Sequence, residues 1–529
     1  MGIPAYFSYI VKNHPTVIKK IEHFKPKINN LYMDCNSIIY DVIHSTEFLK
    51  SDKSNDYIIQ TVIAKIDAYI SVIRPNNNIF IAFDGVAPVA KLEQQRQRRY
   101  KSAYQNKVKY NIFKKSGIVQ PEEWNTSAIT PGTIFMKNLN HSMKKYYNNP
   151  AQFNVDNLIL STSDEHGEGE HKIFAYIRDT PEFHADKTTI IYGLDADLIM
   201  LCINHLHINK NIYLYRETPY FIKTVESSLE PNYSYLLDIP EFAQVISKNM
   251  KFGNNTLYDY IFICFFLGND FMPHFPSLNI RTGGIDKLLN AYKETITSPS
   301  QYLTDGTSIV WKNVRLLVSF LSEQEDNHIK RELVLRDKRE KNYWCDDKPD
   351  NVYKHFELVP SYDRSLEKQL NPNIRSWQHR YYKLLFKIEP DEARIKQICI
   401  NYLEGLEWTM RYYTSGCCDW RWCYNYDYPP LLKDLIKYIP YFETSFVFCK
   451  PPSPVTDVVQ LCYVLPKQSL HLIPYYIYKP LIKHKSDQYP DDCDFSWAFC
   501  KYFWECHADL PYIEISEIEQ FVDNCRLDI

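Results

Sequence analysis

Glycine is scarce in this sequence, and neither sign of charge dominates it. Only 14 of the 529 residues are glycine, where about 7% is usual, so a collagen-like or low-complexity chain is excluded. Lysine and arginine number 61 and aspartate and glutamate 64, which gives a formal net charge of −3. No global basic field therefore attracts nucleic acid, and any such site must be local.

Long apolar runs and paired cysteine motifs are also missing. The longest apolar stretch, Tyr260–Leu267, is far shorter than the roughly 20 residues that a membrane-spanning helix needs. The segment 1–10 lacks the charged region and the cleavage site of a signal peptide. The 14 cysteines form no C-x-x-C pair, so we interpret them as reduced, mostly buried thiols. These absences argue against a membrane protein and against a disulfide-rich secreted one.

Four short apolar segments in the first third of the chain lead into acidic residues. Three are Asn30–Asp34, Asn78–Asp84 and Thr188–Asp195, and the fourth, Leu158–Ser161, precedes the sequence DEHGEGEH at 164–171. Helical patterns alternate with these segments, which is typical of βαβ units and a parallel sheet. The carboxyl ends of parallel strands meet at one edge, where open α/β folds bind ligands. One aspartate after a strand is usually a turn or a helix cap, but four in succession favour a site.

Seven carboxylates are expected at this edge. Six lie in or just after the four segments just described, and the seventh, Asp270, follows an apolar helix, 261–267, that stops at Gly268. The set is Asp34, Asp84, Glu168, Glu170, Asp195, Asp197 and Asp270. So many like charges repel one another unless cations neutralise them. Oxygen-only ligands suit Mg²⁺ or Mn²⁺, and two such ions about 4 Å apart hydrolyse phosphodiesters. We therefore predict a two-metal site; the alternative is scattered caps and surface acids. His171 is interpreted as a helix-face or neighbouring residue and not as a ligand.

A basic helix face is predicted just after Asp84. Lys91, Gln95, Arg98 and Arg99 recur at i, i+4, i+7 and i+8, which places them on one side of a helix. Three cations and an amide that point the same way suit an anion with several oxygens. A solvated basic surface is the alternative, but the neighbouring carboxylates favour an anion pocket.

The C-terminal part is aromatic and follows a charged stretch. Every second residue from Trp420 to Tyr428 is aromatic, which predicts an extended segment with one face in the core. At least one of its tryptophans, Trp420 or Trp422, could also stack on a base of single-stranded nucleic acid. The alternating charges of 320–350 indicate a solvated helix. We accordingly divide the chain into an N-terminal nuclease domain (1–320), a charged linker (321–375) and a helical, aromatic-rich region (376–529).

Together these segments resemble the Xrn family of 5′→3′ exoribonucleases. Long and specific signatures of that family cover nearly the whole chain, at 1–10, 31–41, 83–103, 129–133, 165–178, 192–201, 266–276, 415–430, 464–474 and 489–497. The resemblance implies an α/β fold: a PIN-like parallel-sheet catalytic core with helices on both faces, and a mostly helical second region packed against it. It also implies two Mg²⁺ ions on the seven carboxylates. The expected reaction is stepwise hydrolysis of single-stranded RNA from a 5′-monophosphate end, releasing nucleoside 5′-monophosphates.

The resemblance assigns the remaining candidate site residues as well. Lys91, Gln95, Arg98 and Arg99 match the family's 5′-phosphate pocket, and Trp420 or Trp422 matches a base-stacking tryptophan. Tyr40 stands where the family usually has a histidine that stacks on the first base. An aromatic face is thus retained, whereas a titratable ring is lost.

We expect a compact family member. The sequence stops soon after the second conserved region, without the C-terminal accessory domains of large cytoplasmic members or the zinc knuckle of nuclear ones. The expectation is a cytoplasmic, monomeric enzyme of RNA decay, with a viral origin conceivable. Two alternatives stay open: a flap-type 5′ DNA nuclease, which uses a similar acid cluster, and a catalytically inactive RNA-binding scaffold. The basic helix and the aromatic region favour RNA, and the complete acid set argues against the scaffold.

Overall fold

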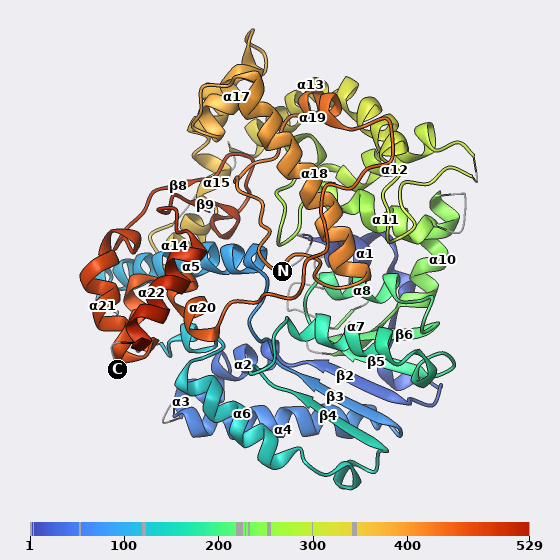
Figure 1. Cartoon of the computed structure of the whole chain (residues 1–529), viewed down its shortest axis with the longest axis vertical. Helices are drawn as coiled ribbons and strands as arrows, with labels where there is room; N and C mark the ends of the chain where they lie inside the picture. Colours follow the sequence, from blue (N-terminus) through green and yellow to red (C-terminus); the bar gives the residue numbers. More distant parts are fainter. Residues whose placement is uncertain are drawn as a thin grey trace.

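A mixed β-sheet forms the centre of the N-terminal part of the protein (Figure 1). This computed structural model describes residues 3, 5–51, 54–118, 123–217, 226–227, 229–230, 233–250, 255–298, 300–340 and 346–527. Within those residues the sheet has seven strands in the order β1-β7-β6-β5-β2-β3-β4. The parallel strands are β2 (Asn30–Asp34), β3 (Asn78–Ala82), β4 (Asn157–Ser161), β5 (Thr188–Tyr192) and β6 (Asn211–Glu217). β7 (Ser234–Asp238) and β1 (Ile18–Lys20) extend one edge in antiparallel fashion. The predicted parallel-sheet α/β core is confirmed.

Helices cover both faces of this sheet. Alternate residues of a strand point to opposite faces, so Leu31 and Met33 of β2 enter one hydrophobic core while Tyr32 enters the other. The first core lies under α2 (Asn36–Ile43), α3 (Thr46–Lys50), α4 (Asn55–Ile73) and α6 (Ile134–Tyr146). The second lies under α1 (Tyr6–Asn13), α7 (Gly169–Asp179), α8 (Asp197–Asn204) and α10 (Ile239–Met250). Burial on both faces explains why these strands read as nearly continuous apolar runs.

The rest of the described chain is mainly helical, and part of it packs against the second core. Its helices are α11 (Thr256–Cys264), α12 (Gly284–Thr295), α13 (Trp311–Glu340), α14 (Pro349–Glu357), α15 (Val359–Tyr362), α16 (Ser365–Leu370), α17 (Trp377–Leu385), α18 (Glu392–Thr414), α19 (Leu432–Tyr438), α20 (Asp457–Val464), α21 (Tyr475–Lys485) and α22 (Ile515–Leu527). A small hairpin, β8 (Phe495–Ser496) with β9 (His507–Ala508), is the remaining sheet. Buried residues of α8, α11, α12, α13 and α18 belong to one hydrophobic cluster with the sheet. The expected helical second region packed on the α/β core is confirmed.

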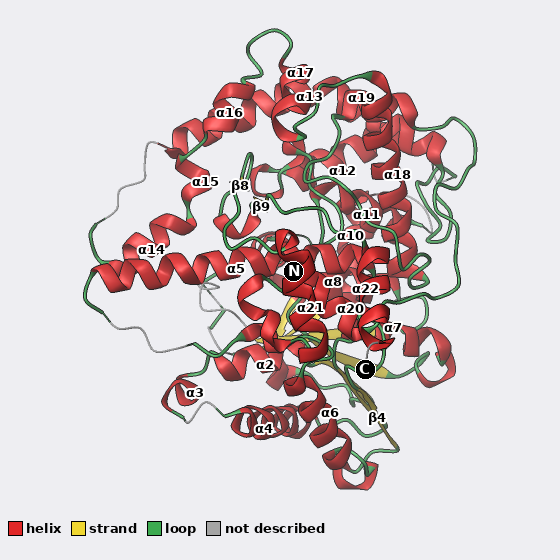
Figure 2. Ribbon diagram, turned by 60° about the vertical axis from the view of Figure 1, so that its left-hand side comes forward, coloured by secondary structure: helices red, strands yellow, loops and turns green. Residues whose placement is uncertain are grey.

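The long helix α5 (Val89–Lys115) joins the two parts. It starts directly after Pro88 and extends away from the sheet, with α14 beside its far end (Figure 2). Gln97 pairs with the backbone of Ala508: its Nε2 donates to the carbonyl over 3.1 Å and its Oε1 accepts from the amide over 2.8 Å. Arg96 donates to the carbonyl of Pro511 over 2.8 Å. One side of α5 therefore carries the C-terminal segments, which leaves its other side for the predicted basic face.

The charged stretch near residue 320 is a helix, but the prediction that it is solvated is wrong for one of its faces. α13 runs unbroken through position 321, and Glu325, Glu332 and Arg336 are buried. Glu325 accepts hydrogen bonds from the amides of Leu432 and Lys433, at 2.8 and 3.2 Å, and so caps α19. Charge alternation alone did not reveal these long-range partners. The three-part division of the chain stays a prediction.

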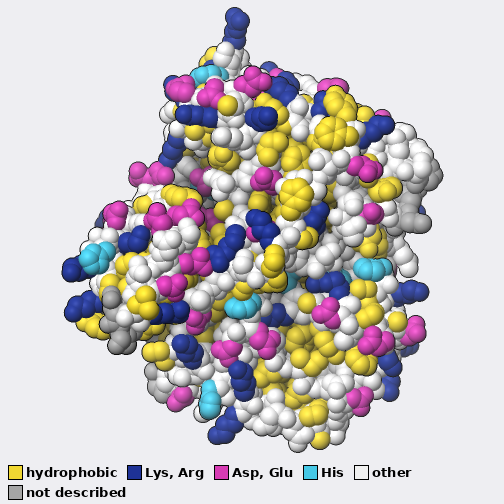
Figure 3. Space-filling model, viewed as in Figure 1, with side chains coloured by type: hydrophobic (Ala, Val, Ile, Leu, Met, Phe, Trp, Pro, Cys, Tyr) yellow, Lys and Arg dark blue, Asp and Glu magenta, His cyan; other side chains and the backbone are white. Residues whose placement is uncertain are grey.

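The aromatic segment 420–428 forms no strand: it begins in a turn at 420–421 and ends in a bend at 427–428, although one of its sides lies in the core. Tyr424 and Tyr428 are buried, whereas Asn425 and Asp427 are exposed. Acidic, basic and apolar side chains are interspersed over the face in Figure 3, which fits the small net charge. Among the described helices, none is both long enough and apolar enough to cross a membrane.

Candidate active site

The seven predicted carboxylates lie at a strand end, on loops and at helix starts along the carboxyl edge of the parallel sheet. Asp34 ends β2, and Asp84 follows β3 by two residues. Glu168 immediately precedes α7, and Glu170 is in its first turn. Asp195 follows β5, and Asp197 is the first residue of α8. Strand direction thus brings together residues that are far apart in the sequence, as the pattern predicted.

Asp270 reaches the same edge from the second region. The short helical turn Phe265–Leu267 ends at Gly268, whose φ is 83°. A Cβ at this glycine would lie 2.8 Å from the amide nitrogen of His274, so both conformation and space require glycine. The sharp turn places Asp270 beside α5, where its Oδ2 accepts a hydrogen bond from Lys91 Nζ over 2.7 Å.

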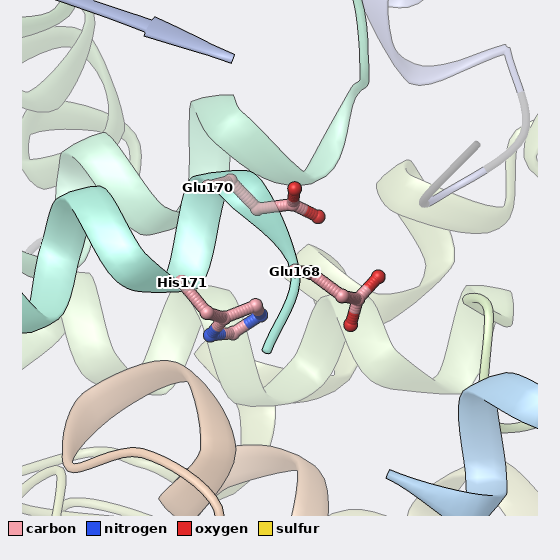
Figure 4. Close-up of side chains that lie close together, drawn as sticks. All are labelled: Glu168, Glu170 and His171. Carbon is pink, nitrogen blue, oxygen red and sulfur yellow. The ribbon is translucent and has the colours of Figure 1, made fainter. Parts of the chain in front are cut away.

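Two overlapping groups of side chains are close enough to share a metal ion. Carboxylate oxygens of Asp34, Asp84 and Glu170 lie within 4.8 Å of one another, and so do ligand atoms of Glu168, Glu170 and His171. In Figure 4 the carboxylates of Glu168 and Glu170 project to the same side, and the His171 ring, on α7, lies near them. That ring stacks on Tyr412 with centroids 3.7 Å apart. The interpretation of His171 as a helix-face residue and not a ligand stays a prediction.

Neighbouring groups fix the orientation of individual carboxylates. Asn36 Nδ2 donates to Asp84 Oδ2 over 2.7 Å, and the amide of Gly169 donates to Asp84 Oδ1 over 2.7 Å. The Tyr412 hydroxyl donates to Glu168 Oε1 over 2.8 Å, and Lys91 forms an ion pair with the same carboxylate. Lys91 therefore bridges Glu168 and a carboxylate of the second region. The sequence prediction did not include Asn36 or Tyr412, whose roles depend on contacts between distant segments.

Burial and mutual repulsion alter the acidity of the cluster. Burial, followed by the charge of Asp84, raises the pKa of Asp34 well above its usual value. Burial and then Glu168 likewise raise the pKa of Glu170. Burial and then Asp270 raise the pKa of Asp197 to about 7. For Asp270, burial acts to raise the pKa, but the ammonium of Lys91 outweighs it and the pKa is lowered. The cluster therefore needs more positive charge than Lys91 supplies.

The carboxylates fit divalent cations by chemistry and by their unused oxygens. Asp34 Oδ1 and Asp197 Oδ1 are buried, and neither accepts a hydrogen bond within the described part of the chain. An unpaired carboxylate oxygen is costly to bury unless a cation or a donor meets it. Carboxylate oxygens are the ligands that hard divalent cations prefer. The buried acidic cluster can thus bind metal.

The basic face of α5 lies beside the cluster. Lys91 is buried against the acids, and the side chains of Gln95, Arg98 and Arg99 follow on the same side of the helix. Burial opposes the charge of Arg98, but Tyr40 and then Asp270 outweigh it, and the pKa of Arg98 is raised. Arg99 Nε is buried and donates no hydrogen bond to a described residue. This face therefore has donors that an anion could use.

The candidate stacking residues differ in their surroundings. Tyr40 is half-buried on α2, close enough to Arg98 and Arg99 to act on the charge of both. Trp420 is half-buried, its ring centroid lies 6.3 Å from that of His166, and its carbonyl accepts from the amide of Val89. The ring of Trp422 stacks on that of Trp408 with centroids 5.0 Å apart. Contact with Trp408 ties Trp422 to the core, whereas Trp420 lies next to the acidic loop.

Comparison with protein families covers most of the chain. The model described as XRN 5′-3′ exonuclease N-terminus matches residues 1–218, and the Xrn1 helical domain matches residues 251–357 and 362–525. The chain belongs to the XRN family of 5′-3′ exonucleases. The junction between the two matches falls at 219–250, earlier in the chain than the boundary proposed near 320.

Curated XRN relatives match over most of the chain. It is 26% identical to "5′-3′ exoribonuclease 2 homolog" of Drosophila melanogaster over 97% of its length, and 27% identical to "5′-3′ exoribonuclease 2" of Gallus gallus over all of it. It is 27% identical over 90% of its length to "5′-3′ exoribonuclease 1" of Saccharomyces cerevisiae. The chain spans 70% of the first two relatives and 40% of the yeast one. The resemblance to the Xrn family and the expected 5′→3′ exoribonuclease class are confirmed.

Proposed function

We propose that this XRN protein hydrolyses single-stranded RNA stepwise from a 5′-monophosphate end and releases nucleoside 5′-monophosphates. The proposal rests on one relationship above all: an anion-binding helix face lies directly beside a buried cluster of carboxylates. Lys91 belongs to both, because its ammonium contacts Asp270 and Glu168. A phosphate bound on the helix face would set the distance to the acids, so that cleavage falls one nucleotide from the end.

Asp34, Asp84, Glu168, Glu170, Asp195, Asp197 and Asp270 would hold two divalent cations, Mg²⁺ or Mn²⁺. Such ions supply activation of water and stabilisation of the departing 3′ oxygen. The protein's own contribution is orientation: Asn36 and the Gly169 amide hold the Asp84 carboxylate, and Tyr412 holds that of Glu168. The raised pKa values of Asp34 and Glu170 support this assignment, because cations relieve the repulsion that causes part of the rise.

Selection of the RNA end is assigned to the helix face and not to the acids. Gln95, Arg98 and Arg99, with Lys91, would bind the terminal phosphate. Tyr40 would stack on the first base, and Trp420 or Trp422 on a base nearby. A 5′-hydroxyl leaves the arginines without a phosphate to bind. The monomeric state and the cytoplasmic location stay predictions from the sequence.

Cleavage assays that vary only the 5′ end test the proposal. A labelled RNA bearing a 5′-monophosphate, a 5′-hydroxyl or a 5′-triphosphate is incubated with the full chain, with Mg²⁺ or with a chelator. We expect rapid release of mononucleotides from the monophosphate RNA alone, and only with the metal.

A DNA strand of the same sequence and a DNA flap serve as controls. Preferential cleavage of the flap would instead support a structure-specific DNA nuclease. RNA binding without cleavage under every metal condition would support the inactive scaffold.

A further inference from the structure

A cavity of about 760 Å³ lies on the flank of α5 next to the proposed phosphate face. Gln94, Arg98 and Lys101 line it from α5, and the turn 267–274 lines it from the second region. The segments 423–428 and 496–512, which include the β8–β9 hairpin above α5 in Figure 1, complete the wall. Small-molecule sites have volumes of roughly 300–1,000 Å³, so the space is sufficient for a mononucleotide.

Several buried polar atoms in this wall form no hydrogen bond with a described residue. Both amide atoms of Gln94 are buried without a hydrogen bond to any described residue, and so are Nδ2 of Asn269 and Nε2 of His274. Burial lowers the pKa of His274 to about 4, so the ring is neutral at neutral pH. Unpaired buried polar groups cost free energy, and an amide and a neutral imidazole can bind the hydrogen-bonding edges of a base or the hydroxyls of a ribose.

Arg98 connects the cavity to the reaction site. It belongs to the proposed phosphate face, and it also lines the cavity. Within the described part of the chain it forms no ion pair and donates no hydrogen bond, whereas other cations of the wall are engaged. Arg281 pairs with Glu505 over 2.7 Å, and Lys101 donates to the carbonyls of Trp504 and Cys506. Arg98 is therefore the cation of this wall that can bind a phosphate.

In stepwise cleavage the product must leave the phosphate face by a route that the incoming strand does not occupy. Each hydrolysis adds water across the first phosphodiester: the 3′ oxygen leaves protonated on the product, and the phosphate stays on the strand as its new 5′ end. That new end must move to Arg98 and Arg99 before the next cycle. Tyr40, which is proposed to hold the first base, lies close enough to Arg98 and Arg99 to interact electrostatically with both. The cavity, in contrast, is lined by Arg98 and Gln94 and not by Arg99.

We propose that this cavity receives the nucleoside 5′-monophosphate released in each cycle, with its phosphate on Arg98 and its nucleoside against Gln94 and His274. The inference rests on the proposed function. Residues of α5 and of the turn after Gly268 then contribute to the release of product as well as to the binding of RNA.

Equilibrium binding of adenosine 5′-monophosphate to the full chain without RNA tests this assignment by calorimetry. Replacing Gln94→Leu or His274→Leu is expected to raise the dissociation constant about five- to ten-fold, the effect of one lost hydrogen bond. The matched control is Gln105→Leu, the same substitution on α5 at a position that does not line the cavity. It should bind the nucleotide like the unmodified protein. Thermal unfolding identifies any variant that fails to fold, in which case the other cavity variant decides.

Unchanged nucleotide affinity in the cavity variants would overturn the inference. So would a lower affinity in Arg99→Ala but in none of the cavity variants, or the absence of binding to the unmodified protein at millimolar nucleotide. Because the measurement involves no turnover, it is independent of the proposed function. Normal RNA cleavage with unchanged nucleotide affinity in the variants would refute only the cavity assignment. Variant-sensitive nucleotide binding in a chain that does not cleave RNA would refute the proposed function.

Discussion

The hydroxyl of Tyr412, on α18, donates a hydrogen bond to Glu168, which lies 244 positions earlier at the start of α7, over 2.8 Å. The helical second region therefore contributes directly to the acid cluster. Tyr412 also stacks on Trp408, which in turn stacks on Trp422. A continuous set of aromatic contacts thus links the proposed metal ligands to the aromatic segment of the second region.

Removing this hydroxyl should impair catalysis without unfolding the protein. Tyr412→Phe keeps the ring contacts but frees Glu168, so we expect about a ten-fold lower kcat and a higher Mg²⁺ concentration for half-maximal rate. Tyr402→Phe is the control, because Tyr402 lies on the same helix and its hydroxyl donates to the carbonyl of Pro273 and not to a carboxylate among the described residues. Metal titrations of the cleavage rate compare the two. If both variants have the kcat and the Mg²⁺ dependence of the unmodified protein, the Tyr412 hydroxyl has no role in catalysis and its ring serves only in packing.

The helix face should determine the preference for the 5′ end. Arg98→Ala or Arg99→Ala is expected to cost about 1.5–3 kcal/mol on monophosphate RNA, which is typical of a lost charged hydrogen bond, and much less on 5′-hydroxyl RNA. Arg98→Lys should recover only part of the loss, because lysine cannot form a bidentate contact. Values of kcat/KM for both RNAs measure the preference. A double alanine variant that keeps its full preference would identify this face as an ordinary solvated surface.

Tyr40 should act through its ring and not through its hydroxyl. Tyr40→Ala is expected to lose on the order of 1–3 kcal/mol of stacking, while Tyr40→Phe and Tyr40→His keep most activity. Cleavage rates at limiting RNA concentration compare the three. Equal losses in the alanine and phenylalanine variants would point to a hydrogen bond from the hydroxyl.

The buried cap of α19 should make stability depend on pH. Burial raises the pKa of Glu325 to about 8, far above its value in the unfolded chain. The folded state therefore binds a proton that the unfolded state releases, and this group lowers stability as pH rises from about 4.5 to 8. Glu325→Gln cannot ionise, so its melting temperature should fall less over that range than that of the unmodified protein. Melting temperatures that fall equally with pH in both proteins would contradict the raised pKa of Glu325.

The sequence predicted the parts of the site that strand and helix geometry determine. Asp34 and Asp84 follow parallel strands, and Lys91, Gln95, Arg98 and Arg99 share a face of α5, so periodicity was sufficient to group them. Contacts across long separations were not predictable in this way. Tyr412 lies within an aromatic-rich helix whose pattern indicates only burial, and Glu325 lies in a stretch of mixed charge that is typical of a solvated surface.

The most direct test of the account is the turnover of Asp195→Asn, Asp197→Asn on 5′-monophosphate RNA with saturating Mg²⁺, together with its melting temperature in a chelator. Loss of two carboxylates should reduce the rate by orders of magnitude, because metal ligands are removed. The chelated protein should melt at the same or a higher temperature, because repulsion among buried acids is relieved. Near-normal turnover by this double variant would contradict a metal-dependent reaction at the carboxylate cluster.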